Sequence, residues 1–341
     1  MKAQILQGTD AAEFITNSWR PYGFDKHGRP VDERGGLMVN ERELASNAFL
    51  NQEEWEILDK AVFERAKLRL NAYQDVVSAG LTRSSSLAAW YSKWRVASER
   101  IEANVTMDFR TRVDFDRTDK KTYGVPLPIY SAAYTLGRRE LLSARAAGQQ
   151  IETFEAEEAA AAVAEKAEDI LINGDTSVVV AGNSIPGYRT LDARNTATAA
   201  AYGGGDFGTI TNITDTFLGM LSALAALRYR GPFNCYIHNT QYHQMLAFYT
   251  DGSGQTALER VESLPQINSV KPNDLIGTAG DLVMVQMTRN VVDIEIALTL
   301  ENRRWEAPDG SAMFFVVMLS AVPRLKTDYA GTAGIAHATS C

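Results

Sequence analysis

The stretch TFEAEEAAAAVAEKAEDILING, from Thr153 to Gly174, decides the fold and predicts one long helix. Alanine has the highest helix propensity and fills most of the central positions. Thr153 suits the N-cap because its side-chain oxygen can accept a hydrogen bond from a free backbone N–H, and glutamates in the first turn suit the positive end of the helix dipole. Gly174 is expected to end the helix, since glycine readily adopts a left-handed conformation. Taken alone, the helix is typical of the core of an ordinary domain.

The composition bounds the class of protein. The chain has 341 residues, enough for two or three domains with cores of their own, and its 45% hydrophobic and 22% charged residues are normal for a soluble globular protein. It contains no run of about 18 apolar residues, so we expect no membrane-spanning helix. The two cysteines are too few for a disulfide framework, and no secretory signal is recognisable, which favours a reducing compartment. The net charge of −8 argues against a nucleic-acid-binding module, although a shell that only encloses nucleic acid need not be basic.

The chain before the long helix is predicted to begin with an arm and two helices. Residues 1–48 are polar and too poor in apolar residues for a core, so we expect an extended arm, with a short helix near Ala11–Ser18, that lies on the rest of the chain or on a neighbouring subunit. Apolar residues recur at three- and four-residue spacing over Asn51–Val77, which predicts one amphipathic helix. A second, weaker helix is expected over Leu87–Arg95, and its aromatic residues are interpreted as core packing.

A long β-hairpin is predicted next. Asn104–Phe115 alternates strictly between apolar and polar residues, which predicts a strand with one exposed face. Tyr123–Tyr134 is predicted to return as a second extended run, at a sheet edge because its two prolines cannot donate to a ladder. A long hairpin with little core beneath it is marginal alone, so we expect it to lie on a partner. The residues of its charged tip are therefore our candidate inter-subunit site: Asp116, Arg117, Asp119, Lys120 and Lys121.

The second half of the chain is predicted to be mixed α/β. Ser177–Ala200 is rich in Gly, Asn and Thr and is expected to form a loop. Ala330–Cys341 is interpreted as a small-residue tail with little to hold it. Between them we expect helices at Thr214–Tyr229 and Thr240–Tyr249, strands at Phe233–His238, Leu282–Met287, Val291–Leu300 and Met313–Val322, and a mixed segment at Gly252–Thr278.

No catalytic, cofactor or metal motif is recognisable in the sequence. Gly203–Gly208 is glycine-rich but lacks the lysine of a phosphate loop. His238 and His243 are out of phase for one helix face, so a zinc site is not expected. Asp293 and Glu295 share one face of a predicted strand, as catalytic carboxylates can, but a solvated strand face explains them equally well. We therefore expect no enzyme activity, no cofactor and no metal.

In their order, these segments resemble the shell proteins of tailed phages and encapsulins, the HK97-fold family. The resemblance covers most of residues 48–337. Four stretches of this sequence are similar, in order, to the family's N-terminal helical segment, its returning extended loop, its spine helix with the turn after it, and its closing strands. The stretches that carry it are NQEEWEILDKAVFERAKLRLNAYQDVVSAGL (Asn51–Leu81), VPLPIYSAAYTLGRREL (Val125–Leu141), ILING followed by GNSIPGY (Gly182–Tyr188), and VVDIEIALTLENRRWEAPDGSAMFFVVMLSAVPRL (Val291–Leu325).

The resemblance implies an α+β, HK97-like capsid fold and a structural role. Its expected parts are an N-terminal arm (1–48), N-terminal helices (49–104), an extended β-hairpin loop (105–130), a peripheral domain (131–190 and 286–341) with a spine helix (153–173), and an axial domain (191–285). The implied function is that of a major capsid protein, which self-assembles through hexamers and pentamers into an icosahedral shell around double-stranded DNA. Expected partners are other copies of the chain, decoration, scaffold or portal proteins, and non-specifically contacted DNA. The implied location is a virion assembled in the cytoplasm of a bacterial host, without a membrane.

Two other functions stay open at this point. An encapsulin-like compartment would enclose a cargo enzyme, although the 48-residue arm exceeds what compact encapsulin subunits carry and favours a phage capsid. An unrelated α/β enzyme would form a small, discrete oligomer with a convergent polar pocket. Some relatives crosslink their subunits through a lysine of the extended loop. Lys120 and Lys121 lie on the predicted tip, but no partner asparagine or activating acid can be placed, so we expect no crosslink.

Overall fold

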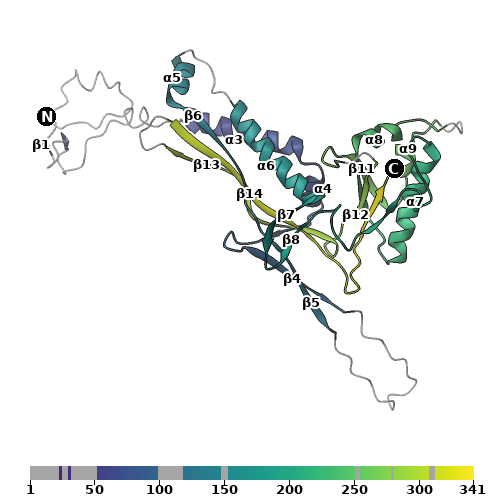
Figure 1. The fold of residues 1–341 in the computed structure, drawn as a ribbon. Helices are drawn as coiled ribbons and strands as arrows, with labels where there is room; N and C mark the ends of the chain where they lie inside the picture. The colour runs from purple at the N-terminus through teal and green to yellow at the C-terminus, as the bar shows by residue number, and fades with distance from the viewer. Residues whose placement is uncertain are drawn as a thin grey trace. The chain divides into compact units, whose positions relative to one another are not determined.

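The computed structural model describes residues 23–24, 30–31, 52–98, 118–146, 153–249, 254–277, 280–306 and 312–341. The chain, drawn in Figure 1 with its helices and strands labelled, divides by internal contacts into two compact units. Unit 1 comprises Met1–Ala61, Tyr134–Ala156 and Arg304–Phe315, and unit 2 comprises Val62–Ala133, Glu157–Arg303 and Val316–Cys341. Within the region of the predicted arm, only strands β1 (Gly23–Phe24) and β2 (Pro30–Val31), which pair antiparallel, are described. The predicted helix at 11–18 and the predicted strand at 104–115 lie outside the described residues.

The alanine-rich stretch forms helix α6 (Phe154–Ile172), as predicted. Gly174, just beyond its end, has a φ of 74°, and a Cβ at this position would lie 2.4 Å from the carbonyl oxygen of Ile185. Glycine is therefore required there both for its backbone conformation and for the close approach of the chain. A shorter helix, α5 (Arg138–Ala146), precedes α6 in the sequence.

The single helix predicted over Asn51–Val77 is wrong, because the structure has α3 (Gln52–Arg69) and α4 (Ala72–Ser78). The carboxylate of Glu168 on α6 accepts hydrogen bonds from the backbone N–H groups of Ala72 and Tyr73, at 2.7 and 2.9 Å. These are free donors at the first turn of α4, and Asn71 offers no side-chain cap. A carboxylate that is distant in sequence therefore fixes the start of a second helix.

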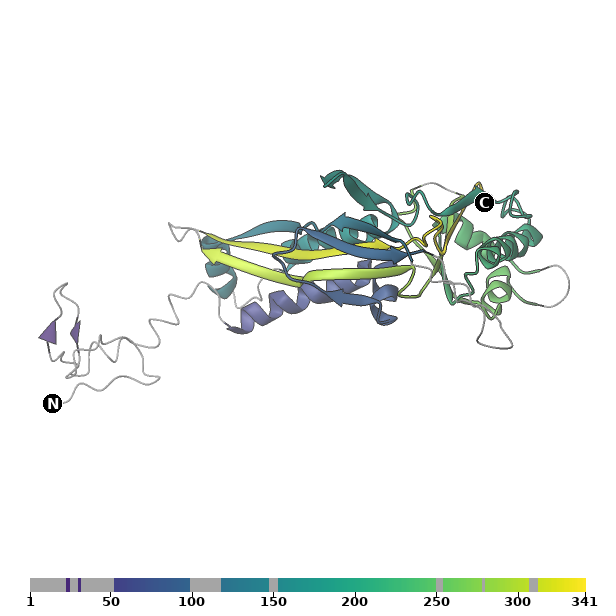
Figure 2. The same cartoon turned by 90° about the horizontal axis from the view of Figure 1, so that it is seen from below.

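A four-stranded sheet has the order β3-β13-β14-β6. Its strands are β3 (Thr82–Ser84), β13 (Val292–Glu306), β14 (Ala312–Leu325) and β6 (Tyr130–Gly137). Both β13 and β14 run longer than the sequence predicts, and they lie side by side in Figures 1 and 2. The N-terminal half of β14 buries every second residue, Met313, Phe315, Val317 and Leu319, which is the period of a strand with one face against the core.

The extended hairpin is formed by β4 (Tyr91–Ala97) and β5 (Lys120–Pro126). They pair antiparallel, from Tyr91 opposite Pro126 to Ala97 opposite Lys120. The helix predicted over Leu87–Arg95 is therefore wrong: a run this short cannot separate a period of 3.6 from a period of 2, and the cross-strand partner decides. The predicted return run Tyr123–Tyr134 is divided between β5 and β6, and Pro126 lies at the end of a strand, where proline is tolerated.

The loop predicted over Ser177–Ala200 is also wrong, because it contains three strands. β7 (Gly174–Val180) and β8 (Asn183–Pro186) form a hairpin, and β9 (Asn195–Thr198) joins the five-stranded sheet. Ala181 and Gly182 connect β7 to β8 with φ values of 52° and 79°. Two successive left-handed residues are typical of a type I′ turn, whose twist matches that of the strands it joins.

The five-stranded sheet has the order β11-β10-β12-β15-β9. The strands not yet introduced are β10 (Phe233–Ile237), β11 (Ile267–Pro272), β12 (Leu282–Gln286) and β15 (Ile335–Thr339). β15 pairs antiparallel with β12 and parallel with β9. The loosely held tail expected over Ala330–Cys341 is thus wrong: Ile335, Ala336 and Ala338 are fully buried, and their small size suits a tightly packed strand.

Three helices cover this sheet: α7 (Ile210–Ala226), α8 (Asn239–Met245) and α9 (Ala257–Glu262). Figures 1 and 2 both show them gathered around its strands. The core between them includes Phe217 and Leu224 of α7, Phe233 of β10 and Met284 of β12. A Cβ on Gly219 of α7 would lie 1.7 Å from the carbonyl oxygen of Tyr202, so the helix packs directly against backbone. None of the described helices has the length and apolar character needed to cross a membrane.

Candidate assembly site at the base of the hairpin

The base of the β4–β5 hairpin is fixed to the rest of unit 2 by side-chain contacts. Asn183 Nδ2, after the β7–β8 turn, donates to the hydroxyl of Tyr91 at 2.6 Å. Lys121 Nζ donates to the carbonyl oxygen of Tyr329 at 3.2 Å and lies 4.1 Å from the centroid of its ring. A Cβ on Gly124 would lie 2.3 Å from the Tyr91 ring, so glycine leaves the space that the ring fills. One contact on β4 and one on β5 therefore hold the base of the hairpin against the rest of unit 2.

The structure separates the five predicted site residues. Asp116 and Arg117 lie outside the described residues, and Asp119, Lys120 and Lys121 lie where β5 begins, opposite Ser98, Ala97 and Val96. Lys121 is already bound to Tyr329 of its own chain, whereas Lys120 is exposed. A role for these five residues in contacts between subunits stays a prediction.

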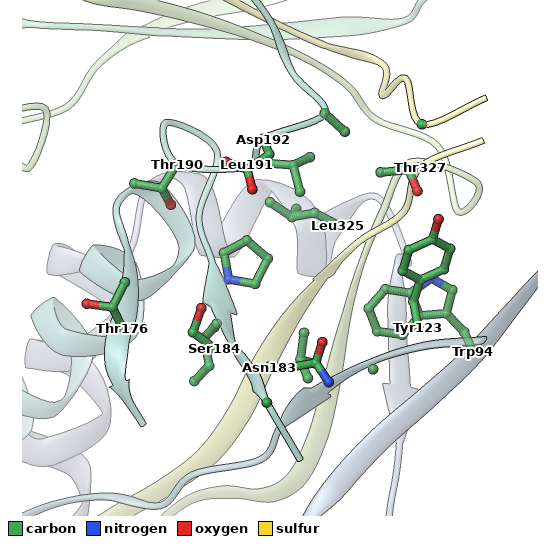
Figure 3. A pocket seen from close by; sticks show the side chains of 17 residues that line it. Trp94, Tyr123, Thr176, Asn183, Ser184, Thr190, Leu191, Asp192, Leu325 and Thr327 are labelled. Atoms are coloured by element: carbon green, nitrogen blue, oxygen red, sulfur yellow. The ribbon is translucent and has the colours of Figure 1, made fainter. Parts of the chain in front are cut away.

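A cavity of about 560 Å³ lies beside the hairpin base (Figure 3). Trp94 and Tyr123 form one wall, with their rings stacked at a centroid distance of 6.3 Å and an interplanar angle of 24°. The other walls come from β7 and β8, from residues 190–193 and from the chain after β14. Polar lining side chains are Thr176, Asn183, Ser184, Thr190, Asp192 and Thr327.

Asp192 is the one charged residue among those that line this cavity. It is exposed, and none of the described residues forms a hydrogen bond or ion pair with its side chain. Figure 3 shows it on the side of the cavity away from Trp94 and Tyr123. This cavity could not be predicted from the sequence, because its walls come from four segments that are distant in sequence.

The cavity does not assemble a catalytic centre. No histidine, lysine or cysteine is among its lining residues, so the carboxylate of Asp192 is the one lining side chain that could act as a base for the hydroxyls of Ser184 and Thr190. Thr190 Oγ1 is occupied as an acceptor for Gly187 N–H at 2.8 Å and as a donor to the Asn173 carbonyl oxygen at 2.9 Å. Within the described ranges, no group of three or more His, Cys, Asp or Glu residues is arranged to hold a metal ion. The absence of enzyme activity stays a prediction.

A buried ion-pair cluster supports the aromatic wall from behind. Arg324 donates from Nε and Nη2 to the two oxygens of Asp293, at 2.6 and 2.5 Å, and its Nη1 lies 2.9 Å from Glu295. Ser92 of β4 donates to Glu295 at 2.5 Å, and the Arg324 guanidinium lies 5.9 Å from the centroid of the Trp94 ring. The cluster therefore ties the hairpin base to β13 and β14.

The interpretation of Asp293 and Glu295 as a solvated strand face is wrong. Their exposed fractions are 2% and 6%, and both carboxylates are neutralised within the chain. Arg324 and Lys326, two residues apart near the end of β14, repeat the spacing of the two acids on β13 and could have indicated the pairing.

A second network fastens the five-stranded sheet to the end of α6. Asp281, next to β12, accepts from Arg189 Nε at 3.1 Å and lies 3.3 Å from His337 Nε2. Arg189 also donates from Nη1 to Asn173 at 2.8 Å, and Arg194 Nε donates to His337 Nδ1 at 3.3 Å. Burial of Asp281 favours its neutral form, but the contact with His337 and the hydrogen bonds and positive charge of Arg189 outweigh burial and lower its pKa.

A third network joins α4 and α6 to the same sheet. Glu168 is almost fully buried and accepts from Asn273 Nδ2 at 2.8 Å, in addition to its two bonds with α4. Burial raises the pKa of Glu168, even though these three hydrogen bonds act in the opposite direction. Asp75 of α4 accepts from Lys271 Nζ at 2.5 Å and from the Tyr236 hydroxyl at 3.1 Å.

Comparison with solved structures shows the HK97-like capsid fold. The virus-like particle from Pyrococcus furiosus matches with a TM-score of 0.59 at 14% identity, over 83% of this chain and 98% of the other. The capsid of Myoviridae phage XM1 matches with a TM-score of 0.57 at 11% identity, over 78% and 91%. The capsid of the empty GTA particle matches with a TM-score of 0.56 at 14% identity, over 76% and 88%. At these identities the likeness establishes the fold alone, and it confirms the predicted class.

Sequence comparison adds a family match. A model described as a family of unknown function, DUF6260, matches residues 45–338. No curated protein matches the sequence.

Proposed function

Because the chain belongs to the DUF6260 family and has the HK97-like capsid fold, we propose that it is a major capsid protein. Its copies self-assemble through hexamers and pentamers into an icosahedral shell that encloses double-stranded DNA. The observation that carries the proposal is the extent of the fold match, which covers 88–98% of the subunits of two capsids and one virus-like particle.

Exposed apolar side chains support self-association. Trp90 is 82% exposed, Phe248 66% and Ile129 53%. Large apolar groups in contact with water are unfavourable, and in soluble proteins they commonly mark contacts with other proteins. Trp90 and Ile129 lie close to the hairpin base, since the Trp90 carbonyl oxygen accepts from Leu127 N–H at 3.1 Å. Contacts between identical copies would cover these side chains repeatedly around each symmetry axis.

The proposal gives the chain a structural role in a virion assembled in the bacterial cytoplasm. It requires neither an enzyme activity nor a cofactor. Its partners are other copies of the chain first, with decoration, scaffold or portal proteins and non-specifically contacted DNA as further partners. The alternative is an encapsulin-like compartment that encloses a cargo enzyme. We retain it because the chain matches 98% of the length of the Pyrococcus particle subunit.

Electron microscopy tests the proposal directly. The chain is produced in bacteria, separated by size exclusion, treated with nuclease and imaged by negative stain. We expect uniform shells, or capsomers that close into shells. Nuclease-protected DNA in shells made together with the other genes of the locus would support the capsid, whereas a single co-purifying cargo protein would support the compartment. A monodisperse dimer or tetramer that never assembles would contradict both.

A further inference from the structure

We propose that the cavity at the hairpin base binds a basic side chain from a second copy of this chain. The inference rests on the proposed function, because it identifies the group that fills the candidate assembly site when subunits meet. It assigns to the cavity a partner chemistry, a lysine or arginine on a surface segment, that none of the described residues of the subunit supplies to Asp192.

The cavity carries a negative charge, which favours a cation as its occupant. Its lining carries one carboxylate, that of Asp192, and the remaining polar side-chain groups are neutral: hydroxyls, one amide and the indole N–H of Trp94. An isolated carboxylate at the edge of a partly enclosed cavity gains most from a cation that enters, because the surrounding protein screens the interaction less than bulk water does. The cavity therefore selects a positive charge.

Three cations close to this lining in the sequence are already bound within the chain. Arg324, next to the lining residue Leu325, is paired with Asp293 and Glu295. Arg194, two residues after Asp192, donates from Nε to His337 and from Nη1 to the Leu191 carbonyl oxygen at 2.8 Å. Lys121 of β5 is bound to Tyr329. A cation that pairs with Asp192 must therefore be a residue other than these three.

The remaining walls suit the head group of a basic side chain. Tyr123 contributes an aromatic ring, to which ammonium and guanidinium groups are attracted, beside the Trp94 ring that already lies 5.9 Å from the Arg324 guanidinium. The oxygens of Thr176, Ser184 and Thr327 can accept hydrogen bonds from its N–H groups. The volume of about 560 Å³ also admits part of the segment that carries the side chain.

A second copy is the partner that the chain itself supplies. A shell of identical subunits places the same surfaces next to one another at every contact. The described surface carries exposed basic residues that no other described residue pairs with, including Arg83, Lys120, Arg228 and Arg230. Charge complementarity between such a residue and Asp192 would fix the register of neighbouring subunits more than it would add affinity.

Charge variants at Asp192 provide the first test. Asp192→Asn keeps the shape of the side chain and should raise the subunit concentration needed for half-assembly by about tenfold. Asp192→Lys should prevent the formation of shells. The matched controls are Asp215→Asn and Asp215→Lys, at an exposed carboxylate of α7 that no described residue pairs with. Circular dichroism and thermal unfolding of the unassembled subunits verify that each variant folds.

A photo-crosslinker at Thr327, which lines the cavity, identifies the occupant. Shells are assembled from equal amounts of unlabelled and ¹⁵N-labelled chains, irradiated and digested. We expect crosslinked peptides that join a light chain to a heavy chain, with a lysine or arginine in the captured peptide. Crosslinks confined to single copies, or normal shells from Asp192→Lys, would overturn this inference while leaving the capsid function intact. Failure of the unmodified chain to form shells would overturn the proposed function and this inference with it.

Discussion

At the scale of single residues, Arg324 neutralises two carboxylates that are almost fully removed from water. Arg324→Met would leave Asp293 and Glu295 buried with only Lys326 as a counter-charge, and we expect it to lower the free energy of unfolding by about 3–5 kcal/mol. Arg303→Met breaks the exposed pair with Glu301, where the side chains are 53% and 41% exposed, and should leave the free energy of unfolding almost unchanged because water screens this pair. Guanidinium unfolding of unassembled subunits measures both, and equal losses would contradict the role of burial.

Asp281 makes the stability of unit 2 depend on pH at the acid end. Its pKa is lowered in the folded state from the usual 3.8, so the unfolded chain binds a proton more readily. The stabilisation is therefore complete above pH about 4 and is lost as the pH falls through the folded-state pKa. Unfolding curves between pH 2.5 and 7 should fall more steeply at the acid end for the unmodified chain than for Asp281→Asn. Glu168 acts in the opposite sense, because burial raises its pKa and its protonation therefore favours the folded state. Glu168 is present in both chains, so the difference between their unfolding curves reports on Asp281.

At the scale of elements, the β7–β8 turn contains a residue that its conformation does not suit. Ala181 has a φ of 52°, and a left-handed conformation disfavours alanine by about 1–2 kcal/mol, whereas asparagine tolerates it. Asn-Gly is also a preferred pair for a type I′ turn. Ala181→Asn should therefore stabilise unit 2 by about 0.5–1 kcal/mol, seen as a higher thermal midpoint. The same substitution at exposed Ala200, whose φ is not positive, should bring no gain; a loss at Ala181 would contradict the turn assignment.

The elements that the sequence predicts well are those whose signals are local. Helix α6 is specified by its own alanines and by Gly174, and it appears within one residue of the predicted bounds. The break between α3 and α4 depends on Glu168, and β4 depends on its pairing with β5. The strand β15 is apolar mainly through small residues, and its two partners make it a strand. In each of these cases a contact with a distant segment overrides the local pattern, and no window of sequence contains that contact.

At the scale of the whole molecule, the hairpin should be required for assembly and dispensable for folding. Ser98 N–H donates to the Asp119 carbonyl oxygen at 2.7 Å, so these residues face each other across the hairpin. Replacing residues 99–118 by Asn-Gly joins them through a tight turn. We expect the shortened chain to keep the circular dichroism spectrum and unfolding midpoint of the subunit but to form no shells by electron microscopy. Shells of normal size from this variant would contradict a role of the hairpin in contacts between subunits.

The candidate site was predictable only in outline. A long, charged hairpin with little core indicates a contact with a partner, and Asp119, Lys120 and Lys121 are predicted to take part in that contact. The cavity at its base requires Asp192, Trp94 and Thr327 to come together from three parts of the chain. Neither spacing nor composition records such a convergence, because each segment taken alone has the pattern of an ordinary strand or loop.

The position of β15 in the five-stranded sheet has a consequence for how the chain is made. Among the described strands, β9 pairs with β15 alone, and β15 lies far later in the sequence, so β9 cannot complete its ladder until β15 has left the ribosome. Helix α6 and the β7–β8 hairpin rely on nearer partners and can form earlier. Products of premature termination would therefore present an open sheet edge along β12 in place of a finished subunit. Only chains that have been translated to the end of β15 would then complete the sheet and be able to join a growing particle.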